Sequence, residues 1–332
     1  MHTDLRTTPA DDAGATTTNA PHHGETAAAG GTPPLRILLA VTNDDAETAA
    51  LSVAHALATR RHAQVTALSA FDPARYGVPG TAATVLGFAD AILGSGFREE
   101  REIRLHEHIA AHFGAPQPWA TDVELGDAAS CIARGARTHD STLVVLGLHH
   151  HGAVARALGD DTARAVMRRV AVPILGVRPT LTTLPTRITV GVDFSDASTR
   201  VARTALELLD ENGALELVYV RPSIPLGATE ETQGLARIVI GGIDAAFTQL
   251  IDALHVPPSV RVTRIVREGN PADELLSHAE ATQPDLIAVG PQRHSRLSRL
   301  LLGSVTSAVL DDGRWSVLVT PPSRDADEES DR

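Results

Sequence analysis

The chain has 332 residues, 43% of them hydrophobic, and a formal net charge of −12 at pH 7, so its length and apolar content predict two domains that each bury a core. The acidic balance and an aromatic content of only 3% argue against general binding to nucleic acid or to a membrane surface. All 29 residues counted as Lys or Arg are arginines and Cys131 is the one cysteine, which argues against lysine-dependent phosphate loops, lysine nucleophiles, disulfides and cysteine-rich metal sites.

The two ends of the chain have the composition of disordered segments. Residues 1–34 are mainly Thr, Ala, Gly, Pro and Asp, and residues 322–332 are acidic, so neither segment buries enough apolar surface to offset the entropy of ordering. No stretch approaches the roughly 18 apolar residues of a membrane span, and the N-terminus lacks the apolar segment of a signal peptide. We therefore expect a cytoplasmic protein without a membrane segment.

Between these ends, short apolar runs alternate with helical patterns, and the alternation occurs twice. Ile37–Val41 is a continuous apolar run followed by a helical pattern over 46–59, and Ile188–Val192 is followed by a helical pattern over 197–209. Such runs are typical of strands that are buried on both faces. The sequence therefore predicts two copies of one α/β domain.

Glycine spacing supports the repeat and locates an insertion. Gly126 and Gly269 are separated by the same number of residues as Gly147 and Gly290, whereas the first strands of the two copies lie further apart. The first copy must therefore have extra residues between its second and third strands, in the glycine-rich stretch 76–96. We expect that stretch to be an irregular loop.

Each copy is predicted to contain five strands alternating with four helices. This alternation favours a parallel sheet with right-handed crossovers, helices on both faces and ligands outside the carboxyl ends of the strands. In the second copy, we expect strands at about 187–192, 214–220, 260–266, 286–289 and 316–320, and helices near 196–210, 231–254, 271–282 and 304–311.

The segment from Gly290 to Val305 has the features of an anion-binding loop. It leaves a buried strand, passes through a polar stretch whose first arginine is Arg293, and enters a helix at Gly303 and Ser304. Glycine permits close backbone approach, and the free N–H groups of a helix start attract anions. The alternative is an ordinary strand-to-helix loop with Ser304 as a cap and solvated arginines.

This loop resembles the nucleotide loop of the universal stress protein family, Gly-x2-Gly-x9-Gly-Ser/Thr, because Gly290, Gly303 and Ser304 keep its spacing. Arg293 stands where the family has its second glycine, and its side chain either hinders backbone approach to phosphates or donates to them. The segments 190–195 and 269–271 also resemble the family's first strand with its turn and the start of its third helix.

The resemblance covers about residues 35–321 and implies a fold. It implies two tandem Rossmann-like domains of the adenine nucleotide alpha hydrolase-like type, each with a five-stranded parallel sheet in the order 3-2-1-4-5. The expected boundaries are 35–179 and 187–321, joined by a linker over 180–186. In the family the last strands mediate pairing, so we expect 174–177 to pair with 317–320 about a pseudo-twofold axis, with a further homodimer as an open possibility.

The resemblance also implies a ligand for the second domain. In ATP-binding members of the family, an acid after the first strand and a residue that ends the second strand meet the adenine, while the glycine loop holds the phosphates. The implied base-side residues are Asp193 and Val220, and the implied phosphate-side residues are Gly290, Arg293, Gly303, Ser304 and Val305, with Mg²⁺ accompanying the ATP. The alternative for Asp193 is a turn or capping role beside Ser195 or Asp196 at the helix start.

The first copy departs from this pattern. Thr42 stands at the position of Asp193, His150 at that of Arg293, and Asp160 and Asp161 at those of Gly303 and Ser304. Two carboxylates would repel phosphate by about 1–4 kcal/mol per like-charge contact at ~4 Å. We predict that the first domain binds no nucleotide.

Other polar clusters carry weaker hypotheses. The run His149–His151 suggests a metal site with the nearby aspartates, but three consecutive side chains do not readily face one ion, so a solvated loop is the favoured interpretation. We expect His106 and His108 to face solvent on a helix and Cys131 to be a small core residue. No arrangement predicts a catalytic triad.

These observations favour a tandem universal stress protein that senses or scaffolds, with ATP bound in residues 187–321 and protein partners of unknown identity. One alternative is a nucleotide-independent protein-interaction module, and another is slow ATP hydrolysis, for which no paired carboxylates or water-positioning base stand out. A dehydrogenase is disfavoured because no G-x-G-x-x-G follows the first strand of either copy.

Overall fold

The strands of the protein form one continuous sheet in a computed structural model that describes residues 34–42, 45–72, 82–148, 160–221, 230–290 and 302–321. Side chains are not described for 45–46, 82–95, 160–161 and 230–240. The strands of the first half are β1 (Arg36–Val41), β2 (Gln64–Phe71), β3 (Ala120–Leu125), β4 (Leu143–Gly147) and β5 (Ile174–Val177). Those of the second half are β6 (Arg187–Val192), β7 (Ala214–Arg221), β8 (Arg261–Glu268), β9 (Leu286–Val289) and β10 (Ser316–Val319).

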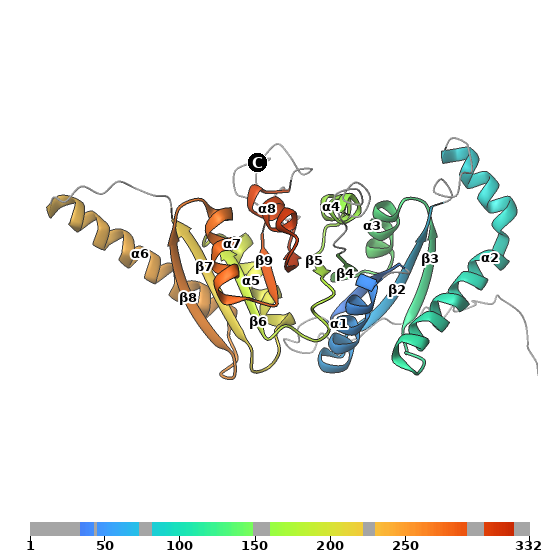
Figure 1. Ribbon diagram of the computed structural model, residues 1–332, viewed down its shortest axis with the longest axis horizontal. Helices are drawn as coiled ribbons and strands as arrows, with labels where there is room; N and C mark the ends of the chain where they lie inside the picture. The colour runs from blue at the N-terminus through green and yellow to red at the C-terminus, as the bar shows by residue number, and fades with distance from the viewer. Residues whose placement is uncertain are drawn as a thin grey trace, which may run out of the picture. The chain divides into compact units, whose positions relative to one another are not determined.

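The helices follow the strands in regular alternation, as predicted (Figure 1). The first half contains α1 (Asp45–Arg61), α2 (Ala82–Phe113), α3 (Ala128–Thr138) and α4 (Asp160–Arg169). The second half contains α5 (Asp196–Leu208), α6 (Glu230–Leu254), α7 (Pro271–Thr282) and α8 (Ser304–Asp312).

The sheet order is β3-β2-β1-β4-β5-β10-β9-β6-β7-β8. Within each half this is the predicted order 3-2-1-4-5 with parallel pairing. The expected pairing of the last strands is confirmed, because β5 and β10 pair antiparallel, with Val317 opposite Gly176, and join the two parallel half-sheets into a single mixed sheet. This pairing satisfies backbone groups that two separate sheet edges would leave open.

Each face of the sheet carries its own core. Leu39, Val190 and Leu318 belong to one cluster with apolar residues of α1, α2, α5 and α6. Leu38 and Ile287 belong to a second cluster with residues of α3, α4, α7 and α8. Because neighbouring residues of a strand point to opposite faces, continuous apolar runs are what this doubly covered sheet requires.

Side-chain contacts reinforce the junction between the halves. The backbone N–H of Arg178 donates to the Ser316 hydroxyl at 3.0 Å. On the face that carries α1 and α5, the Arg60 guanidinium lies 2.5 Å from the Asp210 carboxylate. The buried strands β5 and β10 therefore hold the halves together, with polar contacts around them.

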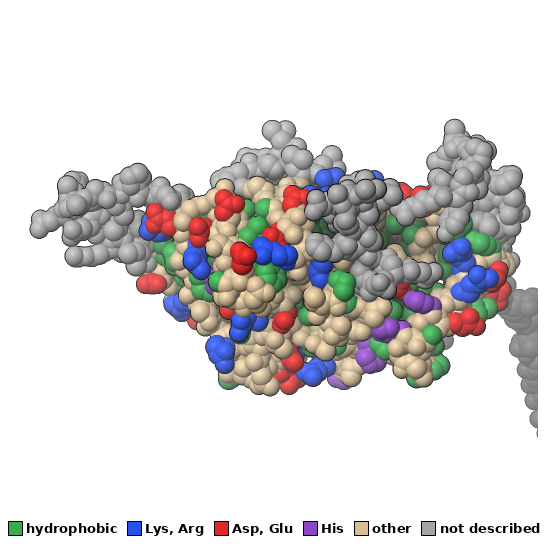
Figure 2. Space-filling model, viewed as in Figure 1, with side chains coloured by type: hydrophobic (Ala, Val, Ile, Leu, Met, Phe, Trp, Pro, Cys, Tyr) green, Lys and Arg blue, Asp and Glu red, His purple; other side chains and the backbone are tan. Residues whose placement is uncertain are grey.

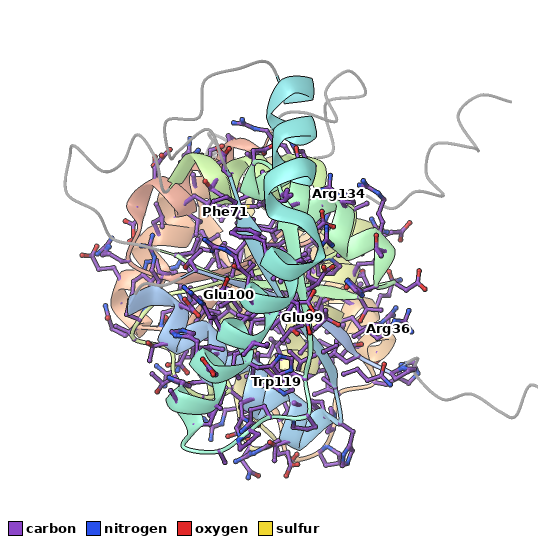
Figure 3. The ribbon with its side chains drawn as sticks, turned by 90° about the vertical axis from the view of Figure 1, so that its right-hand side faces the viewer. Arg36, Phe71, Glu99, Glu100, Trp119 and Arg134 are labelled. Carbon is purple, nitrogen blue, oxygen red and sulfur yellow. The ribbon has the colours of Figure 1, made fainter. Side chains whose placement is uncertain are left out.

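The inserted stretch of the first copy is a correction to the prediction. Residues 82–96 are not an irregular loop, since they form the first part of α2, while 73–81 lie outside the described residues. Scattered glycines cost only about 1 kcal/mol each in a helix that is otherwise rich in Ala, Leu and Ile. Later in α2, the Arg101 guanidinium lies 4.2 Å from the ring centre of Phe71, the last residue of β2. Figure 3 shows Phe71 and Trp119 at opposite ends of this part of the molecule.

Histidines lie where α1 and α2 meet, and Figure 2 shows purple side chains gathered on that part of the surface. The His108 Nε2 atom lies 2.9 Å from a carboxylate oxygen of Glu47, whose side chain is only 1% exposed. The His112 Nε2 atom lies 3.3 Å from the Ser52 hydroxyl. His106 and His108 are exposed, as expected, although His108 also contacts the buried carboxylate.

We expect acid to weaken the contact between α1 and α2. Burial, and then the charges of His108 and His55, lower the pKa of His112 below its ordinary value of 6.5. A histidine whose pKa is lower in the folded than in the unfolded protein makes its full contribution to stability at pH values above the unfolded-state pKa. This contribution is lost as the pH falls through the folded-state pKa. His112→Gln should therefore lose less stability between pH 7.5 and pH 5.0 than the wild type, measured as the urea midpoint. The control, His106→Gln on the exposed side of α2, should keep the wild-type pH dependence, and equal pH dependence in all three proteins would contradict this account.

Candidate nucleotide site at the carboxyl ends of the second sheet half

A pocket of about 360 Å³ opens at the carboxyl ends of β6, β7 and β9. This is where the strand order reverses in the second half, and the volume is that of a small-molecule site. The described lining residues come from β6, α5, β7, α7, β9 and α8 and from the turns between them: Gly191, Val192, Asp193, Ser198, Val218, Tyr219, Val220, Pro271, Leu275, Val289, Gly290, Gly303, Val305 and Thr306.

Asp193 directly follows β6 and is exposed at the pocket. Its carboxylate accepts the backbone N–H of Ser195 at 3.0 Å and also the Ser195 hydroxyl. The Ser195 hydroxyl oxygen in turn accepts the N–H of Ser198 at 3.1 Å and caps α5. The turn and capping roles expected for Asp193 and Ser195 are therefore both present, and they hold the Asp193 carboxylate at the pocket.

The rest of the turn after β6 is held by aromatic packing on the opposite face of the sheet. Phe194 adopts a positive φ of 59°, a conformation that costs a residue with a side chain about 1–2 kcal/mol. Its ring lies 4.7 Å from that of Tyr219 and 4.9 Å from that of Phe247. This packing stabilises the strained turn that presents Asp193.

The apolar part of the pocket comes from β7 and α7. Val218 and Val220 point to the same face of β7, since they are two residues apart, and Leu275 lies one helical turn after Pro271. Asn270 starts α7 by accepting the N–H of Ala272 at 2.9 Å. The pocket therefore offers an apolar surface suited to a flat, weakly polar group.

The polar part of the pocket is the start of α8. Gly303 is the N-cap residue, with φ −58° and ψ 157°, and as a glycine it has no side chain that could cap the helix. Val305 and Thr306 line the pocket, whereas Ser304 is exposed and is not among the lining residues. The first N–H groups of a helix have no intrahelical acceptors, and with the helix dipole they favour an anion.

Gly290 lines the pocket, but its lack of a side chain serves packing as well. A Cβ atom on Gly290 would lie 2.8 Å from a methyl carbon of Val201 in α5. The sequence predicted that this glycine lets a ligand come close to the backbone. The structure shows that it also lets α5 pack closely against the end of β9. Arg293 lies outside the described residues, as does the run His149–His151.

The corresponding edge of the first half is built differently. Thr42 is exposed after β1, and α4 begins at Asp160. Arg169 in α4 donates to the Asp127 carboxylate at 2.8 Å, and Asp127 also caps α3. The Leu148 side chain is buried close against Gly176. In the described part of the first half, this edge therefore has two features: the ion pair that links α3 and α4, and the buried side chain of Leu148.

Two further sequence hypotheses concern reactive groups. Cys131 is buried, as expected, and burial raises the pKa of its thiol to about 11, so the thiol is protonated and unreactive at neutral pH. Within the described ranges, no group of three or more His, Cys, Asp or Glu side chains is arranged to hold a metal ion, and no helix is long and apolar enough to cross a membrane.

Sequence reasoning missed Ser198, Leu275 and Thr306 as pocket residues. Each lies inside a helix rather than in a loop, and Thr306 is only 2% exposed. Helical spacing was the available signal for Leu275, because it follows Pro271 by four residues and so shares its face.

Comparisons with known proteins agree with this architecture. A model of the universal stress protein family matches residues 35–178 and again 185–321. Universal stress protein Rv2005c of Mycobacterium tuberculosis is 26% identical over 200 residues, a match that covers 56% of this chain and 64% of that protein, which is less than two thirds of its length. Universal stress protein MJ0531 of Methanocaldococcus jannaschii is 28% identical over 137 residues, covering 40% of this chain and 80% of the relative.

Solved structures show the same fold at low sequence identity. A universal stress protein from Archaeoglobus fulgidus matches with a TM-score of 0.58 and 16% identity, covering 86% of this chain and 97% of that one. A protein from Pseudomonas aeruginosa described as a putative universal stress protein matches with a TM-score of 0.56 and 15% identity, covering 87% and 93%. The two family matches and the two-part sheet together show that this chain is a tandem member of the universal stress protein family.

Proposed function

We propose that the second half binds one adenine nucleotide and that the protein uses this binding to sense or scaffold rather than to catalyse. The observation that carries the proposal is the start of α8, where the N-cap residue is a glycine without a capping side chain and lines a pocket of ligand size. A helix start with free N–H groups attracts anions, with each favourable charge interaction at an exposed end worth about 0.3–1 kcal/mol.

The residues present fit a nucleotide. The apolar surface made by Val218, Val220 and Leu275 suits a purine ring, and the carboxylate of Asp193 lies where polar base or ribose groups can donate to it. Gly303 and Val305 supply backbone at the phosphate side, with the exposed Ser304 hydroxyl next to them. In this proposal, Arg293 and Mg²⁺ offset part of the phosphate charge when ATP is bound.

The first half is proposed to bind no nucleotide. Its α4 begins with two aspartates, and acids at a helix start stabilise the helix while repelling phosphate. The Asp127–Arg169 ion pair and the buried Leu148 give this half a structural role in the same proposal.

A binding role is favoured over an enzymatic one by the lining of the pocket. Among the described lining residues, Asp193 is the one titratable group able to act as a base near neutral pH, and its carboxylate already accepts two hydrogen bonds from Ser195. Hydrolysis needs a positioned base or a water-orienting group at the phosphate end. We therefore propose a cytoplasmic stress-response protein whose nucleotide is a signal rather than a substrate.

Isothermal titration of the full chain with ATP and Mg²⁺ tests the proposal. The expected result is saturable binding with one site per chain. Two sites per chain would show that the first half also binds, and the absence of heat at millimolar ATP would favour a nucleotide-independent interaction module. Phosphate release above that of a heat-treated control would show an enzyme.

A further inference from the structure

The two edges of the ten-stranded sheet differ in how they are covered. At one edge, α2 packs along β3, which contains the buried residue Val123. At the other edge, β8 pairs with β7 alone, and none of its eight residues is buried. In Figure 1, α6 points away beyond β8. A long exposed edge strand carries a row of open backbone N–H and C=O groups, so it is available to a further strand.

The arginine side chains of β8 favour an added strand that carries negative charge. Arg261 and Arg264 are exposed, and neither makes an ion pair with a described residue. Arg267 contacts the His278 ring at 3.3 Å. Val266 is 46% exposed, one of two large apolar side chains that are exposed in the described part of the chain. This edge is therefore basic, in a chain whose net charge is −12.

The acidic C-terminal segment has a complementary spacing. The arginines of β8 recur at every third position, and Asp325, Glu328 and Asp331 have the same spacing. In an extended chain, residues three apart point to opposite faces, so both series alternate faces in the same way. We propose that residues 323–332 of a second copy of this chain add to β8 as a further strand, with carboxylates opposite the arginines on both faces of the sheet.

The segment must come from a second copy because its own chain is too short. It leaves the sheet after β10, and five strand spacings of about 4.8 Å, roughly 24 Å in all, separate β10 from the open side of β8. The six residues from Thr320, which follows β10, to Asp325 reach at most about 22 Å when fully extended. The matched register is therefore reached only between two copies, and the interaction is independent of the nucleotide site.

Sedimentation velocity of the full chain tests this proposal. At 50 mM NaCl we expect a concentration-dependent dimer that dissociates at 500 mM NaCl, because exposed ion pairs are screened by salt. The double variant Arg261→Glu/Arg264→Glu and the double variant Asp325→Arg/Glu328→Arg should each weaken dimerisation at least tenfold. The four substitutions combined should restore it, which a merely structural effect of either pair would not do.

Matched controls complete the test. Arg98→Glu/Arg137→Glu makes the same change of net charge at exposed positions of α2 and α3 and should leave the dimer intact. A synthetic peptide of residues 322–332 should compete with dimerisation of the wild type. A chain that stays monomeric at 50 mM NaCl, or a dimer that both double variants leave unchanged, would overturn the proposal.

Discussion

Gly303→Asp is expected to weaken ATP binding by about tenfold or more without weakening the fold. A carboxylate at this position faces the site proposed for phosphate, and a like-charge contact at ~4 Å costs about 1–4 kcal/mol. The backbone angles of Gly303, φ −58° and ψ 157°, are ones that aspartate adopts freely. Aspartate is also a good N-cap residue, so the free energy of unfolding should be unchanged or higher by a few tenths of a kcal/mol.

Gly303→Asn is the matched control for this substitution. Asparagine caps a helix as well as aspartate does and has nearly the same shape, but it carries no charge. It should keep more ATP affinity than Gly303→Asp and should have similar stability. Calorimetric titration with ATP and urea unfolding of the three proteins distinguish charge from shape. Equal ATP affinity in the aspartate and asparagine variants would show that phosphate does not lie at the start of α8.

Phe247→Ala is expected to destabilise the protein by about 3–5 kcal/mol, the usual range for a fully buried phenylalanine. Phe247 is 1% exposed and is among the largest fully buried side chains of the described core. The loss should appear in urea unfolding as a lower midpoint. Phe247→Leu keeps most of the apolar volume and should cost clearly less.

The same substitution should also weaken ATP binding under folding conditions. The Phe247 ring packs 4.9 Å from that of Phe194, whose strained backbone sets the position of Asp193. Loss of this support loosens the turn without touching the pocket itself. A Phe247→Ala protein with lowered stability and unchanged ATP affinity would show that the turn does not depend on the aromatic packing.

Much of the fold could be predicted from local sequence patterns. The buried strands are continuous apolar runs, such as Ile37–Val41, and Asn270 and Ser195 are strong helix-start residues where α7 and α5 begin. The repeat was evident because Gly147 follows Gly126 at the same spacing as Gly290 follows Gly269. These signals are local, and parallel sheets with crossover helices leave few ways to connect them.

Features that depend on tertiary contacts were harder to predict. Glycines in 82–96 suggested a loop, but a helix of good helix formers tolerates them. Gly290 packs against Val201, which lies far away in the sequence, so no local pattern indicates the packing role of Gly290. Leu275 and Thr306 belong to helices, and only the assembled structure shows that both line the same pocket as Asp193 and Gly303.

A crystal structure of the full chain grown with an ATP analogue and Mg²⁺ tests the central claim most directly. We predict one nucleotide per chain, with its phosphates at the N–H groups that open α8 and its base against Val220 and Leu275. Nucleotide density at the start of α4, or a pocket left empty at a saturating analogue concentration, would contradict the claim.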